Sequence, residues 1–278
     1  QALAEDVGNG DVSTALAVAP RQTAGGRLVA RVAGVIAGLP LVSLVYAELS
    51  PAVRVAPCRE DGAAVAPGDV VARVQGPAAA LLKAERTALN FLQHLSGIAT
   101  LTARYAAAVS GTGCLVLDTR KTVPGFRALA KYAVRCGGGA NHRLGLHDRF
   151  LFKDNHWAVA AGRLPALVAA ARLARPDLAV EVEVDSLAQL AALLPLGVDW
   201  ILLDNFTPAQ VVAAVAARDA ADAPVRPRLE VSGNVTLDNA RAYAEAGADA
   251  ISIGRLTHSA PALDVALDFE PAPREPGA

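Results

Sequence analysis

The chain has 278 residues, of which 53% are hydrophobic, and a formal net charge of −1 from 26 basic and 27 acidic residues. It is long enough for one large domain or two moderate ones, and its balanced charge argues against a nucleic acid polymer as partner. The longest apolar stretches, such as residues 34–49, are interrupted by Gly, Pro, Ser or Tyr, so none matches the roughly 20 apolar residues of a membrane-spanning helix.

The first third of the chain is predicted to form strands with Gly and Pro turns, followed by helices. Residues 27–37 and 53–75 have strand character, and two helices are expected over about 78–95 and 99–110. Residues 61–70, DGAAVAPGDV, resemble the hammerhead of lipoyl and biotinyl carriers. A carrier needs a lysine at an exposed hairpin tip, whereas Lys83 lies in a helix pattern, so a structural sheet is the better interpretation.

The rest of the chain alternates short apolar runs with Ala- and Leu-rich helix patterns. Repeated β–α units of this kind indicate parallel strands joined by crossover helices, with a barrel as first choice. A doubly wound sheet is the alternative, but its GxGxxG fingerprint is missing. The expected strands are residues 115–118, 150–153, 180–184, 200–204, 228–232 and 250–254, and the expected helices are residues 164–174, 187–194, 208–217 and 237–246.

We therefore expect an N-terminal domain over residues 1–96 and a barrel over residues 97–264, with the boundary near Ser96-Gly97. A strand-like run at residues 265–269 is expected to return to the first domain, so that residues 265–278 join it. The tail from residue 270, EPAPREPGA, has a composition typical of disorder.

Polar residues and glycines stand where the apolar runs stop, and in a barrel such positions meet at one mouth. Three of the four lysines fall between residues 118 and 153, and the carboxylates Glu183 and Asp204 follow later strands. Arginine and lysine bind carboxylates and phosphates, so this sorting of charge favours a small, multiply charged anion as ligand. Arg127, Lys131 and Arg135 lie on a helix pattern instead and are interpreted as surface or subunit-contact charges.

Two glycine motifs follow the last strands. In Ser232-Gly233-Asn234 the glycine leaves backbone N–H groups open to a phosphate, beside a helix start near Thr236, and Gly254 can act in the same way. Each motif alone is equally an ordinary turn. Glu183 and Asp204 favour Mg²⁺ near phosphates or hydrogen bonds to sugar hydroxyls, with ion pairing to Arg or Lys as the competing interpretation.

Several longer motifs resemble one family, quinolinate phosphoribosyltransferase, over almost the whole chain. They are EDVG at residues 5–8, GDVST at 10–14, ERTALN at 85–90, HLSGIAT at 94–100, DTRKT at 118–122, GGGANHR at 137–143, KDNH at 153–156, EVDS at 183–186 and LLDNF at 202–206. The resemblance implies a type II phosphoribosyltransferase fold, with an N-terminal α/β sandwich and an open α/β barrel. It also implies a homodimer whose active sites are shared between subunits.

In that family, quinolinate attacks C1 of 5-phosphoribosyl pyrophosphate through its ring nitrogen, pyrophosphate leaves, and loss of CO₂ gives nicotinate mononucleotide. The resemblance implies catalytic roles for Lys121, Lys153, Glu183 and Asp204, the last two holding Mg²⁺ or the ribose. It places Arg120, His142, Arg143 and Lys153 around quinolinate, with Arg86 entering from the partner subunit. Lys121 and Lys153 would also meet the phosphates, and Thr119 completes the substrate contacts. The 5′-phosphate would be bound by Ser232, Gly233, Asn234 and Gly254.

Three alternatives stay open at this point. A Schiff-base aldolase would use Lys153 at its strand end, and a relative linked to molybdenum transport shares the fold. Nucleic acid binding is the weakest alternative, because the charge is balanced. The three cysteines, Cys58, Cys114 and Cys136, are odd in number and lack a CxxC pair, which argues against disulfides or zinc and suits a reducing cytoplasm. The lack of Met indicates that residues preceded Gln1.

Overall fold

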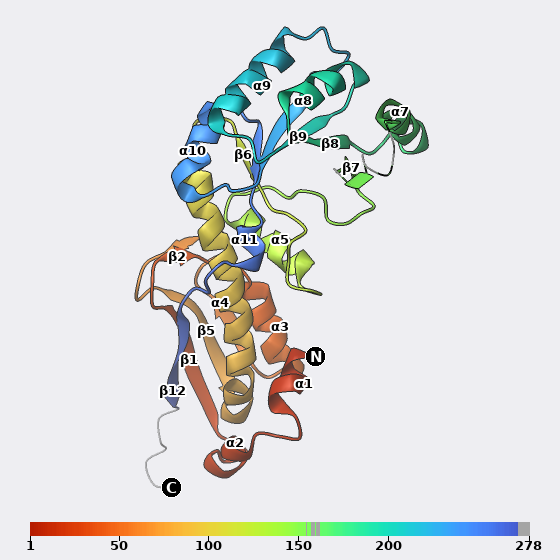
Figure 1. The fold of residues 1–278 in the computed structure, drawn as a ribbon. Coiled ribbons are helices and arrows are strands. Elements are labelled where there is room, and N and C mark those ends of the chain that lie inside the picture. The colour runs from red at the N-terminus through yellow and green to blue at the C-terminus, as the bar shows by residue number, and fades with distance from the viewer. Residues whose placement is uncertain (154, 157–158, 160–161, 272–278) are drawn as a thin grey trace. The chain divides into compact units, whose positions relative to one another are not determined.

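The computed structural model describes residues 1–153, 155–156, 159 and 162–271 (Figure 1). The contacts divide the chain into two compact units. The first comprises residues 1–101, 135–137 and 259–278, and the second comprises residues 102–134 and 138–258. No helix in the described part of the chain combines the length and apolarity needed to cross a membrane. The disorder expected from residue 270 onward is wrong for residues 270 and 271, which lie in a strand, and residues 272–278 lie outside the described residues.

The first unit is built on a four-stranded antiparallel sheet. Its order is β12 (Val265–Pro271), β1 (Thr23–Ala30), β5 (Val70–Pro77) and β3 (Arg54–Pro57). The late strand β12 pairs with β1 along its whole length, from Ala24 opposite Pro271 to Ala30 opposite Val265. A second, two-stranded sheet pairs β2 (Gly34–Val35) with β4 (Ala64–Val65).

Four helices complete this unit: α1 (Ala2–Val7), α2 (Val12–Ala17), α3 (Leu39–Leu49) and the start of α4 (Ala78–Ala108). Buried side chains of the sheet, of α3 and of α4 form one apolar core that includes Leu28, Tyr46 and Leu81. The hammerhead-like segment contributes Asp61, whose carboxylate accepts hydrogen bonds from the amides of Gly38 and Leu39 at 2.8 and 3.1 Å. It thereby binds the unpaired amides where α3 begins.

Helix α4 corrects one prediction, because it runs unbroken for 31 residues through the expected break at Ser96-Gly97. Gly97 is required there by packing, since a Cβ at this position would clash with the backbone of Pro261 and Ala262. Ser96 lies in the same turn, and its hydroxyl accepts a hydrogen bond from the amide of Ala37 at 3.0 Å. The glycine therefore marks a close approach of two chain segments and not a helix end.

The second unit contains a parallel six-stranded sheet of order β6-β11-β10-β9-β8-β7. The strands are β6 (Leu115–Leu117), β7 (Phe150–Phe152), β8 (Val180–Val184), β9 (Trp200–Asp204), β10 (Arg228–Ser232) and β11 (Ala250–Ser252). The first strand pairs with the last, and the others follow in chain order. That cyclic order is that of a barrel, whereas a doubly wound sheet reverses direction in its middle. No pairing joins β6 to β7 among the described residues, so the barrel is open, as expected.

The six expected strands are confirmed, and β8, β9 and β10 have the predicted bounds. Besides the end of α4, the helices described in this unit include α5 (Arg127–Cys136), α7 (Leu164–Ala174), α8 (Leu187–Leu193), α9 (Pro208–Ala220), α10 (Leu237–Glu245) and α11 (Arg255–His258), with a 3₁₀ turn at Leu194–Leu196. Polar caps fix several helix starts. In α9, the Thr207 hydroxyl accepts from the Gln210 amide at 3.4 Å, and the Gln210 side chain accepts from the Thr207 amide at 2.8 Å.

Candidate active site

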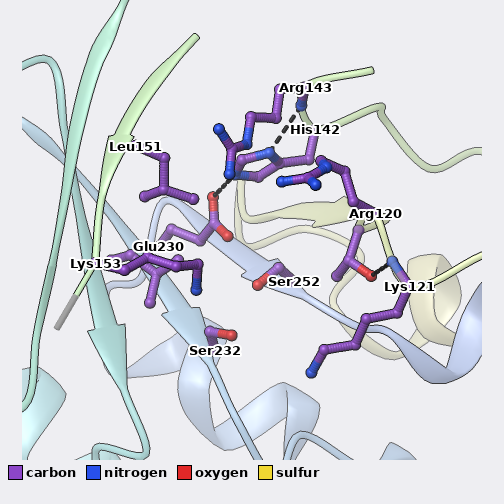
Figure 2. Close-up of a pocket in the computed structure, with 11 residues that line it drawn as sticks. Arg120, Lys121, His142, Arg143, Leu151, Lys153, Glu230, Ser232 and Ser252 are labelled. Carbon is purple, nitrogen blue, oxygen red and sulfur yellow. Dashed lines mark hydrogen bonds and ion pairs between the residues drawn. The ribbon is translucent and has the colours of Figure 1, made fainter. Parts of the chain in front are cut away.

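A pocket of about 320 Å³ opens at the carboxyl ends of the parallel strands, where a barrel places its functional side chains. Figure 2 shows side chains from several strands and loops converging on it. It is lined by Thr119, Arg120, Lys121, His142, Arg143, Leu151, Lys153, Leu202, Glu230, Ser232 and Ser252. Seven of these were expected as site residues from the sequence: Thr119, Arg120, Lys121, His142, Arg143, Lys153 and Ser232.

Two arginines and two lysines give the pocket its positive charge. Burial lowers the pKa of Arg143, and repulsion from the nearby Arg120 lowers it further. The Nε atom of Arg120 is buried and has no hydrogen-bond partner within the described chain. Two guanidinium groups that repel each other beside an unused donor form a site that an anion stabilises, because it supplies both the missing acceptor and the missing charge.

A buried ion pair holds the two segments that carry these cations. The carboxylate of Asp118, at the end of β6, pairs with Lys131 of α5 and also accepts from the His142 amide at 2.9 Å and the Asn141 side chain at 2.6 Å. Lys131 in turn donates to the His142 carbonyl at 2.9 Å. The network therefore joins the segment after β6 to the segment that carries His142 and Arg143.

The sequence-based interpretation of Lys131 and Arg127 is therefore wrong. Lys131 is only 3% exposed, because its ammonium turns inward to Asp118. Arg127 donates to the carbonyls of Arg120 and Leu144 at 3.4 and 3.1 Å and thereby connects two loops. Arg135 is exposed. A helix pattern shows which residues share a face of the helix. It does not show whether a buried acid from another element pairs with one of them.

The expected metal ligands lie beside the pocket. Glu183, at the end of β8, forms an ion pair with Lys153 at 2.5 Å, which is the competing interpretation that the sequence left open. Asp204, at the end of β9, accepts from the side chain of Asn205 at 2.9 Å. Both offer carboxylate oxygens, the ligand type that Mg²⁺ prefers, and the residues present therefore fit such an ion.

Close contacts favour glycine in both glycine motifs, and at Gly233 the backbone conformation requires it as well. Gly233 has φ of 88°, and a Cβ there would clash with the side chain of Asn205. Asn234 also has positive φ, and its side chain donates to Asn205 at 3.1 Å. At Gly254 a Cβ would lie 3.0 Å from Cδ of Lys121, so this glycine gives the lysine room to lie across the end of β11.

Comparisons with known proteins agree along the whole chain. Residues 11–96 match the domain family "Quinolinate phosphoribosyl transferase, N-terminal domain", and residues 98–268 match the corresponding C-terminal domain. The chain belongs to the quinolinate phosphoribosyltransferase family. The nicotinate-nucleotide pyrophosphorylase [carboxylating] of Mycobacterium leprae is 48% identical to it over 272 residues, which cover 97% of this chain and 95% of that protein.

Solved structures of the family confirm the fold class. The crystal structure of NadC from Streptococcus pyogenes has a TM-score of 0.90 and 40% identity, covering 96% of this chain and 92% of that one. The nicotinate-nucleotide pyrophosphorylase of Francisella tularensis has a TM-score of 0.89 and 35% identity, with 96% and 93% coverage. The chain thus shares both units with other quinolinate phosphoribosyltransferases.

Sequence reasoning missed two acids of this quinolinate phosphoribosyltransferase site, Glu181 and Glu230. Both lie within strands, are at most 1% exposed, and face Nε2 of His142 at 3.1 and 3.3 Å. We had considered only the strand ends. A glutamate inside a short apolar strand was the available signal, because alternation along VEVEV places Glu181 on the same side of β8 as Glu183.

Arg86 lies in the first unit, on α4, and its side chain is exposed. In this quinolinate phosphoribosyltransferase its expected role in the site of a partner subunit stays a prediction. Asp154, within the KDNH motif, lies outside the described residues.

Proposed function

We propose that the protein transfers the phosphoribosyl group of 5-phosphoribosyl pyrophosphate to quinolinate and removes one carboxylate, giving nicotinate mononucleotide, pyrophosphate and CO₂ in de novo NAD biosynthesis. The cationic pocket is the observation that supports this most strongly. It combines Arg120 and Arg143, which suit a dicarboxylate, with Lys121 and Lys153, which suit phosphates.

The site contains both cations and carboxylates, which match the opposite charges that develop on the two groups separated by the breaking bond. As the bond from C1 to pyrophosphate breaks, the sugar gains positive character and the leaving group gains negative charge. Lys121 and Lys153 stabilise the leaving group, while Glu183 and Asp204 face the sugar. The aromatic ring nitrogen is the nucleophile, so the protein acts by positioning and electrostatics without a covalent intermediate.

Magnesium is part of this proposal. Glu183 and Asp204 would hold the ion directly or through water, and when bound it supplies positive charge to the pyrophosphate oxygens. Lys153 now pairs with Glu183, and its side chain is 44% exposed. It can therefore exchange this partner for a substrate anion without being drawn out of a buried site.

Gly233, Asn234 and Gly254, with Ser232 and the start of α10, are proposed to bind the 5′-phosphate. Thr119 accepts from the amide of Lys121 at 3.0 Å and so shapes the turn that carries the cations. An aldolase has less support, because Lys153 is ion-paired with Glu183, whereas a Schiff-base lysine is kept in an apolar site or beside another cation.

The proposed enzyme is a homodimer in which Arg86 of each subunit completes the site of the other. A reducing cytoplasm suits the three cysteines, none of which forms a disulfide within the described part of the chain. Mixing Arg86→Ala subunits with Arg143→Ala subunits tests the shared site, because mixed dimers would contain one site with both arginines. Partial recovery of activity is expected, whereas no recovery would show that Arg86 acts within its own subunit or not at all.

The activity itself is tested by incubating the protein with quinolinate, 5-phosphoribosyl pyrophosphate and Mg²⁺. We expect nicotinate mononucleotide and CO₂ in equal amounts, and folded protein that forms neither would exclude the function. The Arg143→Ala variant tests the division of the pocket. It should weaken quinolinate binding far more than binding of 5-phosphoribosyl pyrophosphate, and an equal loss of both would contradict the assignment.

A further inference from the structure

Glu230 lies in the middle of β10 and forms part of the pocket wall (Figure 2). Its side chain is 1% exposed, and neither carboxyl oxygen accepts a hydrogen bond of good geometry among the described residues, while Oε2 lies 3.3 Å from Nε2 of His142. An ionised carboxylate in such a place has lost its water and gained only this one long contact, which is costly. A neutral carboxylic acid avoids this cost. The geometry therefore favours a protonated Glu230 facing the ligand space.

The neighbours of Glu230 support the same protonation state. The carboxylate of Glu181 forms an ion pair with Arg149, whose Nη1 lies 3.1 Å from Oε2 of Glu181. Glu181 and Glu230 thus compete for few donors, and only Glu181 has a guanidinium partner. Burial, followed by repulsion from Glu181, raises the pKa of Glu230. Of the two buried acids, Glu230 is the one that keeps its proton.

His142 joins these acids but offers no ring nitrogen to a ligand. Its Nε2 faces Glu181 and Glu230, and its Nδ1 accepts from the Arg143 amide at 2.7 Å. Burial by itself lowers the pKa of His142, but its attraction to the two acids outweighs this and raises the pKa to about 9. The Arg143 amide acts against a proton on Nδ1. The proton of the cluster therefore lies on its Nε2 side, between the imidazole and the acids.

We propose that Glu230 donates the proton that replaces CO₂ at C2 of the pyridine ring. This inference rests on the function proposed above. After phosphoribosyl transfer, the bond between C2 and its carboxylate breaks, CO₂ leaves, and the electron pair stays on C2 beside the positively charged ring nitrogen. The Glu230 O–H bond then breaks, and its proton bonds to C2. The new carboxylate faces Nε2–H of His142, and a proton from solvent restores the acid.

Among the groups that line the pocket, Glu230 is the best suited to this step. Arg120 and Arg143 are too weakly acidic to give up a proton. Both nitrogens of His142 are engaged within the protein. Lys121 and Lys153 are assigned to the phosphates, and Lys153 already has a carboxylate partner. Glu230 alone in this set combines burial, unused oxygens and a place in the wall.

The Glu230→Gln variant separates the two chemical steps. A carboxamide has nearly the shape of a neutral carboxylic acid but cannot release a proton to carbon. In single-turnover experiments with quinolinate, 5-phosphoribosyl pyrophosphate and Mg²⁺, we expect the rate of pyrophosphate release to stay within about 3-fold of the unsubstituted enzyme. The rate of CO₂ release should fall on the order of 100-fold, the lower range for loss of a general acid, and the undecarboxylated dicarboxylate nucleotide should accumulate.

Glu230→Asp is the matched control, because it keeps an acidic proton on a shorter side chain. It should restore part of the CO₂ release that Gln loses. Equal loss of pyrophosphate and CO₂ release in the Gln variant, or unchanged CO₂ release, would overturn the proposal. If the Gln variant does not fold, Glu230→Ala takes its place, and unchanged CO₂ release in that variant would overturn the proposal. An unsubstituted enzyme that releases no pyrophosphate would instead refute the proposed function.

Discussion

Two clusters of buried charged residues lie close together in the second unit. In one cluster the carboxylate oxygens are hydrogen-bonded, and in the other most of them are not. Around Asp118, Lys131 and Asn141, both carboxylate oxygens accept hydrogen bonds, and the lysine has two acceptors. Around Glu181 and Glu230, three of the four carboxyl oxygens have no hydrogen-bond partner within the described residues.

The cluster around Asp118 stabilises the fold, whereas the cluster around Glu230 keeps carboxyl oxygens available for a chemical step. Burial raises the pKa of Asp118 and of Glu230 alike. Asp118 nevertheless receives three donors, so its network is complete and needs no ligand. Glu230 has only the 3.3 Å contact of one oxygen with Nε2 of His142 and lines the pocket, so a substrate or a proton has to complete it. Equal burial therefore does not mean equal function, and the number of satisfied oxygens decides between the two.

The largest effect on stability is expected from removing the cation of the hydrogen-bonded network around Asp118. Lys131→Met leaves Asp118 buried without its cation, which should lower the free energy of unfolding by about 3–5 kcal/mol. Urea unfolding followed by circular dichroism would measure it. Adding Asp118→Asn should recover much of this loss, since it removes the uncompensated charge but keeps an acceptor for the His142 amide. A single variant as stable as the double variant would show that the pair is not a unit.

The half-exposed ion pair of Lys153 with Glu183 should behave in the reverse manner. Lys153→Ala should reduce kcat on the order of 100- to 1,000-fold, because it removes a cation aimed at the leaving group. Its effect on unfolding should be smaller than that of Lys131→Met, about 1–2 kcal/mol, because the Lys153 side chain is 44% exposed although that of Glu183 is only 12% exposed. Arg175→Ala, which breaks the exposed pair with Asp177, is the matched control and should leave kcat unchanged. A large loss of stability in Lys153→Ala would contradict this contrast.

These contrasts mark the limit of what the sequence could predict. Strands β8, β9 and β10 were predicted to the residue, because a short apolar run bounded by polar residues is a local signal. Local chemistry also indicated Arg120, Lys121 and Lys153, which the fold brings to one pocket. The strands and the residues at their ends needed only the alternation of strands and helices and the rule that barrel strand ends meet. Arg143 stands before its strand and was indicated by the family resemblance of the motif GGGANHR.

The errors came from contacts between segments far apart in the chain. Gly97 was taken as a helix break, although it makes room for the backbone of Pro261. Lys131 was placed on the surface, although its partner Asp118 is 13 positions away on another element. Glu230 was missed, because its importance depends on which donors surround it in space. None of these partners is adjacent in sequence, so periodicity could not indicate them.

The pH dependence of stability offers a test with a smaller effect. His142 has a raised pKa of about 9 against an ordinary 6.5, and that of Glu230 is raised too. Between pH 6.5 and about pH 9, the native cluster binds more protons than the same residues bind in the unfolded chain. The free energy of unfolding is therefore higher at low pH and falls as pH rises, by at most about 1.4 kcal/mol per pH unit for one proton.

Urea titrations at pH values between 7 and 9 would measure this slope. Glu230→Gln should make it shallower, because the substitution removes an acid that holds the proton in the native cluster. Lys83→Ala, which replaces a lysine of the first unit, is a control in which the slope should persist. An unchanged slope in the Gln variant would show that the extra proton is held elsewhere.

The smallest expected effect gives the sharpest comparison of the two clusters. Glu230→Gln should change the free energy of unfolding by less than about 1 kcal/mol at pH 7, because a carboxamide replaces an acid that is already neutral. The same chemical change at Asp118 should cost more, since Asp118→Asn leaves the 3%-exposed Lys131 without its counterion. Chemical unfolding of both single variants under one condition would measure the difference. Equal costs would mean that Glu230 is ionised like Asp118, and both the contrast between the clusters and the proton held by Glu230 would have to be abandoned.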